Sequence, residues 1–296
     1  MKNTIFKGAG VAIITPMNSD GSINFDKLGE LIEFNIENHT DAIVICGTTG
    51  ESATMTDKEH QDCITYAVKK VNGRVPVIAG TGSNDTRYAV DLSKHAEEQG
   101  ADALLVVTPY YNKCSQEGLI KHYYAIADAV NIPIIAYNVP SRTGTNIAVS
   151  TCAELSKHKN IAAIKEASGD ISRVAQIRAA CGDDLDVYSG NDDQIVPILS
   201  LGGKGVISVL SNCMPKETHD ICQLCFENKY DEASKLALKL LEFTNSLFMD
   251  VNPIPAKEAL NLMGFEVGEC RLPLCKMPEE KIEKLKVQMK TIGLVK

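Results

Sequence analysis

The chain lacks the features that would direct it to nucleic acid or to a membrane. It has no long basic run, and its 38 acidic residues outnumber its 30 lysines and arginines, which gives a formal net charge of -8. This balance disfavours general affinity for nucleic acid or anionic lipid, so an anionic substrate requires a local cationic pocket. The short apolar run near the N-terminus is broken at Pro16, which supports neither a signal peptide nor a membrane span. We therefore expect a cytoplasmic protein without membrane or nucleic-acid partners.

Motifs for metal, redox and nucleotide chemistry are also missing. The six histidines form neither HxxxH nor HExxH, so we expect no metal. Ten cysteines are scattered along the chain, and without a secretory signal this favours reduced thiols over a disulfide scaffold. Cys222 and Cys225 form a CxxC on a predicted helix, but no second ligand pair follows at zinc-site spacing. The glycines of residues 8–10 and 80–82 do not complete GxGxxG, which disfavours a doubly wound nucleotide-binding domain.

Short apolar runs recur along the chain with amphipathic segments between them. Each run is bounded by Gly, Pro or Asn, and the segments carry apolar residues at three- and four-residue spacing, several of them behind a helix-capping Asp, Ser or Thr. Eight such runs fit a closed parallel barrel better than the five or six strands of a doubly wound sheet. The predicted strands are 9–14, 42–46, 75–80, 103–108, 133–138, 161–166, 185–190 and 205–210.

We predict an α/β fold, a (β/α)8 TIM barrel with a C-terminal helical appendage. No glycine- or serine-rich linker interrupts the series, and strand-like runs cease after about residue 216. We assign residues 1–215 to the barrel that carries the active site, and residues 216–296 to C-terminal helices packed on the barrel. In such barrels the reacting groups lie at the carboxyl ends of the strands and in the loops just beyond them.

The predicted sixth strand, IAAIKEASGD, places a lysine at the end of an apolar run. By strand alternation, Ile161, Ala163 and Lys165 share one face and point into the barrel together. Desolvation there lowers the pKa of a lysine, and a neutral amine can attack a ketone to form an imine. A lone lysine at a strand end is more often structural, paired with a carboxylate or extended to water, so its neighbours decide the interpretation.

Polar groups follow three further predicted strands. The fifth strand ends in Tyr137, and Arg142 follows in the next turn; a phenol can transfer protons beside an imine, and a guanidinium can bind a carboxylate through two parallel hydrogen bonds. After the second strand, CGTTGES presents Thr48, Thr49 and adjacent N–H groups that can bind a small carboxylate. The segment TPYYNKC places two tyrosines at the same rim. Each group also has an ordinary alternative role in packing, capping or a solvated loop.

Four segments together carry a family resemblance: GTTGES, TPYYNK, YNVPSRTG and IKEASGD. In order and spacing they resemble the dihydrodipicolinate synthase and N-acetylneuraminate lyase family, from about residue 5 through the last predicted strand and more loosely beyond it. The resemblance implies a carbon–oxygen lyase in which Lys165 forms a Schiff base with pyruvate, without metal or organic cofactor. It implies a proton relay of Tyr137, Thr48 and Tyr111, with Tyr111 contributed across a dimer interface. The implied substrate contacts are Thr49, Arg142, Gly190 and Ile207.

Arg142 indicates which reaction of the family to expect. The synthases carry SRTG after YNVP and use this arginine for the carboxylate of aspartate semialdehyde, whereas sialic-acid lyases usually lack it. The resemblance therefore favours condensation of pyruvate with L-aspartate-4-semialdehyde to 4-hydroxy-tetrahydrodipicolinate, the first committed step toward diaminopimelate and lysine, in a homotetramer built from dimers. A sialic-acid or 2-keto-3-deoxy-sugar acid lyase and a catalytically silent pyruvate-binding regulator stay open as alternatives.

A regulatory lysine site is a further implication of the resemblance. The matching positions are Ser52, Ala53, His60, Asn84 and Tyr110. Two other positions depart from the lysine-sensitive pattern, because Asp57 stands where such enzymes often carry histidine and Tyr88 replaces a glutamate that binds the amine of the effector. Loss of an acidic partner leaves an ammonium poorly paired, so we expect lysine inhibition to be weak or absent.

Overall fold

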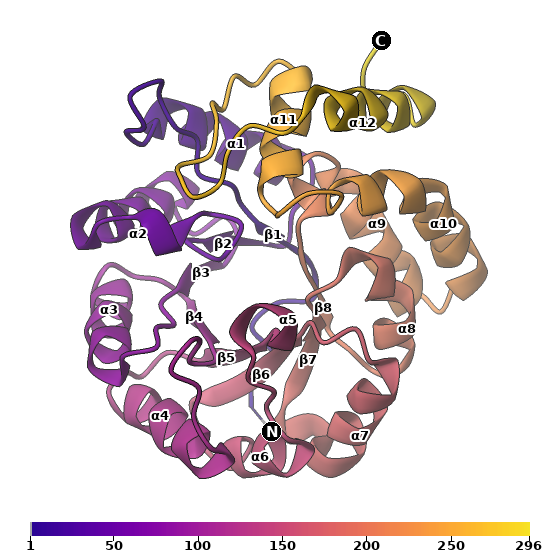
Figure 1. Ribbon diagram of the computed structural model, residues 1–296. Coiled ribbons are helices and arrows are strands. Elements are labelled where there is room, and N and C mark those ends of the chain that lie inside the picture. Colours follow the sequence, from indigo (N-terminus) through magenta and orange to yellow (C-terminus); the bar gives the residue numbers. More distant parts are fainter. Residues whose placement is uncertain (1) are drawn as a thin grey trace.

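The computed structural model describes residues 2–296 and contains a closed barrel of eight parallel strands (Figure 1). Each strand pairs with the next one in chain order, and β8 returns to pair with β1. The predicted TIM barrel is confirmed, and every predicted strand overlaps an observed one. The strands are β1 (Gly8–Ala12), β2 (Ala42–Ile45), β3 (Val77–Gly80), β4 (Ala103–Val107), β5 (Ile134–Asn138), β6 (Ile161–Glu166), β7 (Asp186–Ser189) and β8 (Gly205–Ser208).

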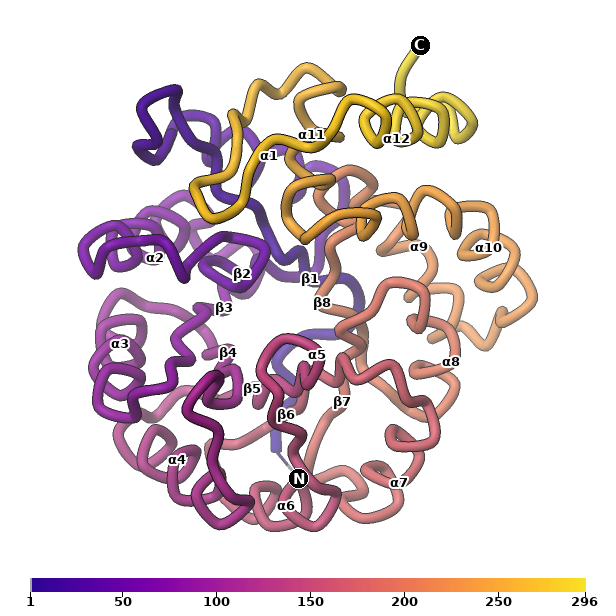
Figure 2. Tube along the Cα trace, viewed as in Figure 1, coloured from indigo at the N-terminus to yellow at the C-terminus, as the bar shows by residue number. Residues whose placement is uncertain are grey.

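Helices surround the barrel, as the tube view also shows (Figure 2). Side-chain caps explain several of their starts: the Thr56 hydroxyl and the Glu59 carboxylate form a reciprocal capping box at α2, and Ser115 caps α4. Within residues 2–296, none of the helices combines the length and apolar character that a membrane crossing requires. The helices are α1 (Phe25–Glu37), α2 (Asp57–Val71), α3 (Thr86–Glu98), α4 (Gln116–Asp128), α5 (Pro140–Thr143), α6 (Val149–Leu155), α7 (Ile171–Cys181), α8 (Ile195–Ser200), α9 (Pro215–Phe226), α10 (Tyr230–Ser246), α11 (Ile254–Leu262) and α12 (Glu279–Thr291), with 3-10 turns η1 (Ser52–Thr54), η2 (Gly182–Asp184), η3 (Asp192–Gln194) and η4 (Leu210–Asn212).

Apolar side chains form two separate layers. The outer layer fills the space between the strands and the surrounding helices. The inner layer fills the barrel itself, where the rings of Phe6 and Tyr188 stack with their centroids 4.4 Å apart. Because the interior is packed, a ligand can meet the barrel only at its ends. The inner layer consists of Phe6, Ala12, Ala42, Val44, Ile78, Ala103, Leu105, Ile135, Tyr137, Val139, Ala163, Tyr188 and Ile207.

The start of β6 departs from the predicted alternation. Ile134 pairs with Ile161 but Ile135 pairs with Ala163, so the register shifts at this point. Ile161 packs in the outer layer, whereas Ala163 lies in the inner one. The prediction that Ile161 shares a face with Ala163 and Lys165 is therefore wrong, because one extra residue in β6 reverses the alternation before it. From Ala163 onward the alternation holds, which keeps Lys165 on the inner face.

The helices after β8 complete the ring and extend it. Helix α9 packs against β1 and β8, where the eighth helix of the ring is expected. Helices α10 and α11 both pack on α12, and this group lies at one side of the barrel (Figure 1). The helical character predicted for the chain after residue 216 is confirmed, whereas the division at residue 215 into a barrel and a separate appendage stays a prediction.

A buried ion pair joins the C-terminal helices to the loop after β2. Lys257 Nζ donates to Glu51 Oε1 at 2.7 Å, and both side chains are 2% exposed. The other oxygen of Glu51 accepts the backbone N–H of Arg271 at 3.0 Å. The Arg271 guanidinium in turn lowers the pKa of Glu59 to about 2. Because Glu51 directly follows the Thr-Thr-Gly turn, these contacts hold that turn in place.

We predict that Lys257→Met lowers the free energy of unfolding by about 3–5 kcal/mol, because it leaves the Glu51 carboxylate buried and unpaired. Urea titration followed by circular dichroism measures this change. Lys121→Met is the matched control, since Lys121 and Glu117 form an exposed pair whose loss costs less than about 1 kcal/mol. Equal small losses in both variants would show that the buried pair contributes little.

Candidate active site

Lys165 lies at the carboxyl end of β6 and its side chain points to the inner face of the barrel. The residue is 6% exposed, and Nζ lies 4.3 Å from the centre of the Tyr137 ring on β5. Burial lowers the pKa of Lys165 from 10.5 to about 7; the Asp192 carboxylate opposes this shift and the Arg142 cation adds to it. A substantial fraction of this amine is therefore neutral near pH 7 and can act as a nucleophile.

Tyr137 and Thr48 meet beside the lysine. Tyr137 is buried, and burial raises the pKa of its phenol, opposed by the Arg142 cation and by a hydrogen bond with Thr48. The phenol is therefore protonated near neutral pH and available as a proton donor. Thr48 lies in the turn after β2, so the barrel brings together two members of the predicted relay from different strand ends.

Tyr111, the third member of the predicted relay, lies elsewhere. Its side chain is 92% exposed, and its backbone φ is 69°. A positive φ is uncommon for a bulky aromatic residue. A side chain so exposed is not packed against Thr48 or Tyr137 of its own chain.

Thr49 and Arg142 are linked through Asn252. The buried Thr49 hydroxyl accepts a hydrogen bond from the Asn252 side chain at 3.0 Å, and the exposed Arg142, on α5, donates to the Asn252 backbone oxygen at 3.4 Å. The side-chain oxygen of Asn252 is buried without a partner among the described residues. The Thr49 hydroxyl and the Arg142 guanidinium lie beside this unsatisfied oxygen, and together they form a polar surface that can bind a small polar ligand. Sequence reasoning missed Asn252.

Gly190 and Ile207 lie on the other side of the lysine. Gly190 follows β7, and a Cβ atom at this position would lie 2.6 Å from the Ala167 Cβ and 3.1 Å from the Lys165 Cε. Only glycine therefore lets the chain pass this close to the lysine. Ile207 lies on β8 and packs in the same inner layer as Tyr137. Sequence reasoning also missed Asp192, two residues beyond Gly190, although its position after a strand end could have indicated it.

Comparison with known proteins identifies the family. The sequence model of the dihydrodipicolinate synthetase family matches residues 5–292. The chain belongs to this family. The curated 4-hydroxy-tetrahydrodipicolinate synthase of Clostridium tetani is 56% identical to it over 99% of this chain and 100% of its own length.

Solved structures of this family have the same fold as the chain. The chloride-inhibited dihydrodipicolinate synthase of Acinetobacter baumannii, complexed with pyruvate, has a TM-score of 0.97 and 43% identity over 99% of this chain and 100% of its own. The dihydrodipicolinate synthase of Cyanidioschyzon merolae with lysine bound has a TM-score of 0.96 and 38% identity, with the same coverage. Family membership and fold therefore agree along the whole chain.

The residues predicted for a regulatory site gather at one cavity of this family member. The cavity has a volume of about 460 Å³ and is lined by Ser52, Ala53, His60 and Tyr110. Asn84 is attached to the same wall, since its side-chain amide donates to the backbone oxygen of Tyr110 at 3.2 Å. Thr48 and Arg142 line the cavity as well, so in a single chain it is continuous with the candidate active site.

Proposed function

We propose that the chain condenses pyruvate with L-aspartate-4-semialdehyde to give 4-hydroxy-tetrahydrodipicolinate, through a Schiff base on Lys165. The observation that carries this proposal is the buried amine at a strand end, with a pKa of about 7, lying 4.3 Å from the Tyr137 ring. The names of the curated relatives support the reaction, since synthases of this kind match the chain at 56% identity over nearly its whole length.

The first half of the reaction joins pyruvate to the enzyme. The neutral Lys165 amine attacks the keto carbon of pyruvate, and the keto oxygen leaves as water, which gives a protonated imine. Tyr137 gives a proton to the departing oxygen and regains one through Thr48. The Thr49 hydroxyl and backbone N–H bind the pyruvate carboxylate. The protonated imine is the electron sink, so the proposed chemistry needs no metal or organic cofactor.

The second half forms the new carbon–carbon bond. Transfer of a proton from the methyl group of the imine to the Tyr137–Thr48 relay gives an enamine, whose terminal carbon attacks the aldehyde of the second substrate while the relay returns the proton to the aldehyde oxygen. Arg142 binds the carboxylate of that substrate through paired hydrogen bonds, as a guanidinium does. The amino group of the substrate then attacks the imine carbon, closes the ring and displaces Lys165, which returns to its free form.

Lys165 and Tyr137 would serve a sugar-acid lyase equally well. Arg142 favours the semialdehyde, because a guanidinium at the rim matches a second carboxylate rather than a polyol. Coupled assays with aspartate semialdehyde and with the sugar acids separate the two activities. A silent pyruvate-binding regulator would form no imine, so the trapping experiment below addresses it.

We also propose that a second copy of the chain completes the site, and that two such dimers form a tetramer in the cytoplasm. The support for the shared site is Tyr111, a 92% exposed tyrosine with a left-handed backbone whose side chain is not packed within its own subunit. Insertion of such a side chain into a neighbouring subunit would bury it and bring its phenol to Thr48.

Reductive trapping tests the covalent step. Borohydride added with pyruvate is expected to fix one adduct per chain on Lys165, and mass spectrometry of the intact chain and its peptides locates it. The trapping rate is expected to rise as the pH increases through about 7, because only the neutral amine attacks. Lys165→Ala is expected to abolish the adduct, and the exposed Lys121→Ala to retain it. An adduct on another lysine, or none, would exclude the proposed mechanism.

Subunit mixing tests the role of Tyr111. Lys165→Ala and Tyr111→Phe are each expected to be nearly inactive alone. In a hybrid dimer, one site combines an intact Lys165 with an intact Tyr111 from the other subunit. Random exchange of equal amounts is therefore expected to restore about a quarter of the activity of the parent enzyme. No recovery after confirmed subunit exchange would contradict a Tyr111 supplied by the other subunit, and full activity of Tyr111→Phe alone would place Tyr111 outside the relay.

We further propose that lysine binds weakly to the regulatory cavity. The Tyr88 hydroxyl donates to the Asp57 carboxylate at 2.9 Å. Burial and then this carboxylate raise the pKa of Tyr88 to about 12, so its phenol stays neutral. Asp57 is therefore already engaged by a neutral donor, and no glutamate stands at position 88 to pair with the ammonium of lysine.

Calorimetric titration with lysine tests this proposal. The parent enzyme and Tyr88→Phe are expected to bind at millimolar concentration or not at all. Tyr88→Glu is expected to tighten binding about tenfold or more, because it adds a carboxylate for the ammonium. Micromolar binding by the parent, or micromolar inhibition of its activity, would contradict the proposal.

A further inference from the structure

Asp192 is a buried carboxylate that connects two strand-end loops of the barrel. It begins η3, just after β7, and is 6% exposed. One of its oxygens, Oδ2, accepts the backbone N–H groups of Val209 and Leu210, in the segment after β8, at 3.0 and 3.1 Å. The other oxygen, Oδ1, is buried and has no hydrogen-bond partner among residues 2–296. Half of the carboxylate therefore has a structural role, and the other half is unassigned.

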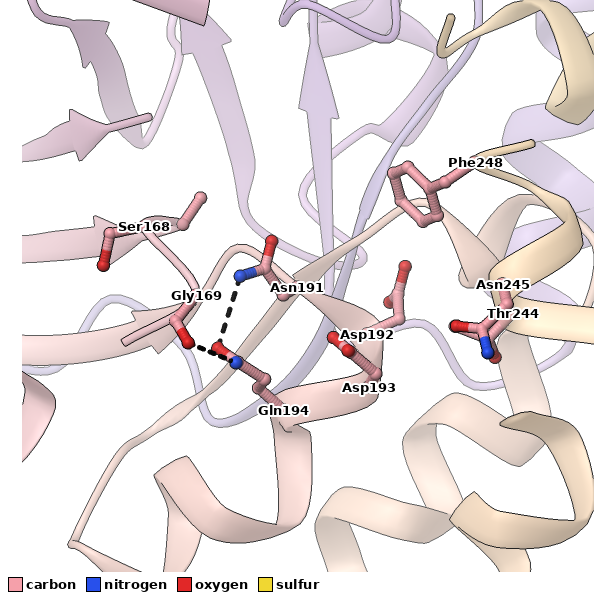
Figure 3. A pocket seen from close by; sticks show the side chains of 10 residues that line it. Ser168, Gly169, Asn191, Asp192, Asp193, Gln194, Thr244, Asn245 and Phe248 are labelled. Atoms are coloured by element: carbon pink, nitrogen blue, oxygen red, sulfur yellow. Dashed lines mark hydrogen bonds between the residues drawn. The ribbon is translucent and has the colours of Figure 1, made fainter. Parts of the chain in front are cut away.

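The carboxylate borders a cavity of about 350 Å³ at the ends of β6 and β7. Figure 3 shows Ser168 and Gly169 on one side of this cavity, and Thr244, Asn245 and Phe248 on the other. Asp193 lines the same cavity but is exposed to solvent. Gly190, two residues before Asp192, lies against the Cε of Lys165. The short stretch that packs on the lysine therefore also carries the buried carboxylate.

Two charged groups from different elements act on Lys165. Asp192 after β7 supplies a negative charge that acts on the amine, and Arg142 on α5 supplies a positive one. Tyr137 on β5 and Tyr188 on β7 have raised pKa values and are neutral near pH 7. The Cys222 thiol on α9 is affected by Asp192, and burial raises its pKa well above 9.0, so it too is neutral. Burial raises the pKa of Asp192 itself, and this shift is opposed by the Ser208 hydroxyl, by the Leu210 and Val209 N–H groups and by the Lys165 cation. Asp192 is thus the acidic group whose negative charge acts on the Lys165 amine.

Asp192 and Lys165 do not form a contact pair. The described residues include no ion pair between them at 4.0 Å or less. A contact pair would hold the amine as an ammonium and remove its nucleophilic lone pair. A carboxylate at longer range lets the amine lose its proton and still stabilises a cation formed at the same nitrogen.

We propose that Asp192 is a positioning residue that stabilises the positive charge of the protonated imine on Lys165. This inference rests on the function proposed above, because it assigns a role in the same covalent step. No bond to Asp192 forms or breaks. Its carboxylate acts through space on the nitrogen, and its Oδ2 contacts hold it in place against the loop after β8.

This role makes a prediction that depends on pH. Above the pKa of Lys165, imine formation consumes a neutral amine, pyruvate and one proton, and it yields a cation and water. The charge of Asp192 then favours the product alone. Below that pKa the resting lysine is already an ammonium, so the free lysine and the protonated imine carry the same charge. The effect of Asp192 on the equilibrium between them therefore cancels. If Asp192 had only a structural role, its loss would lower the equilibrium constant for imine formation equally in both pH ranges.

The decisive experiment measures the imine equilibrium with pyruvate in Asp192→Asn at about pH 8.5 and about pH 5.5, by borohydride trapping and mass spectrometry over a pyruvate series. The equilibrium constant is expected to fall roughly tenfold at the higher pH, as for a pKa change of about one unit, and to stay unchanged at the lower pH. The control is Asp193→Asn, which removes the same formal charge from the exposed neighbour. Its equilibrium constant is expected to equal that of the parent enzyme at both pH values.

The remaining outcomes are also decisive. An equal loss at both pH values in Asp192→Asn, or no loss at either, would overturn the proposal. Should circular dichroism show that this variant does not fold, Asp192→Glu replaces it, since it keeps the charge: a pH dependence like that of the parent supports the proposal, and a loss at the higher pH contradicts it. Trapping in the parent tests the proposed function separately, because its absence would refute the imine itself.

Discussion

Desolvation of the Lys165 amine is the interaction on which the candidate site depends. The inner layer of side chains fills the barrel below the lysine, so its amine cannot reach bulk water while it remains on the inner face of β6. Burial lowers its pKa to about 7. The same packing that stabilises the barrel thus produces a nucleophile at neutral pH, and a lysine on the outer surface would stay protonated.

The surrounding charges adjust this effect without cancelling it. Arg142 disfavours the ammonium and Asp192 favours it, and the two come from loops at different strand ends. Both loops are held by contacts that involve distant parts of the chain. Asp192 is tied to the segment after β8, and Asn252 links the loop after β2 to α5. The electrostatic balance therefore depends on the closed barrel and on the helices that follow it.

The C-terminal helices contribute to the site as well as to stability. The buried pair between Glu51 and Lys257 joins α11 to the turn that carries Thr48 and Thr49. Asn252, just before α11, contacts Thr49 directly. Within one chain these contacts place Thr48 beside Tyr137 but leave Tyr111 on the surface. This incomplete arrangement is the structural basis of the proposal that a second subunit supplies the last phenol.

Most of the fold, and the position of the central residue of the candidate site, could be predicted from the sequence. Short apolar runs bounded by turn residues specify strands locally, so all eight were found, and Lys165 was identified because it ends such a run. The face of Ile161 was predicted wrongly, since a register shift depends on the neighbouring strand rather than on the sequence of β6. Asn252 and Asp192 were missed for a related reason. Asn252 gains its role from a residue 203 positions away, and the charge of Asp192 matters only because strand pairing places β7 beside β6 and β8. Local patterning determined the elements and the place of the candidate nucleophile, and only tertiary packing decided which distant polar groups act on it.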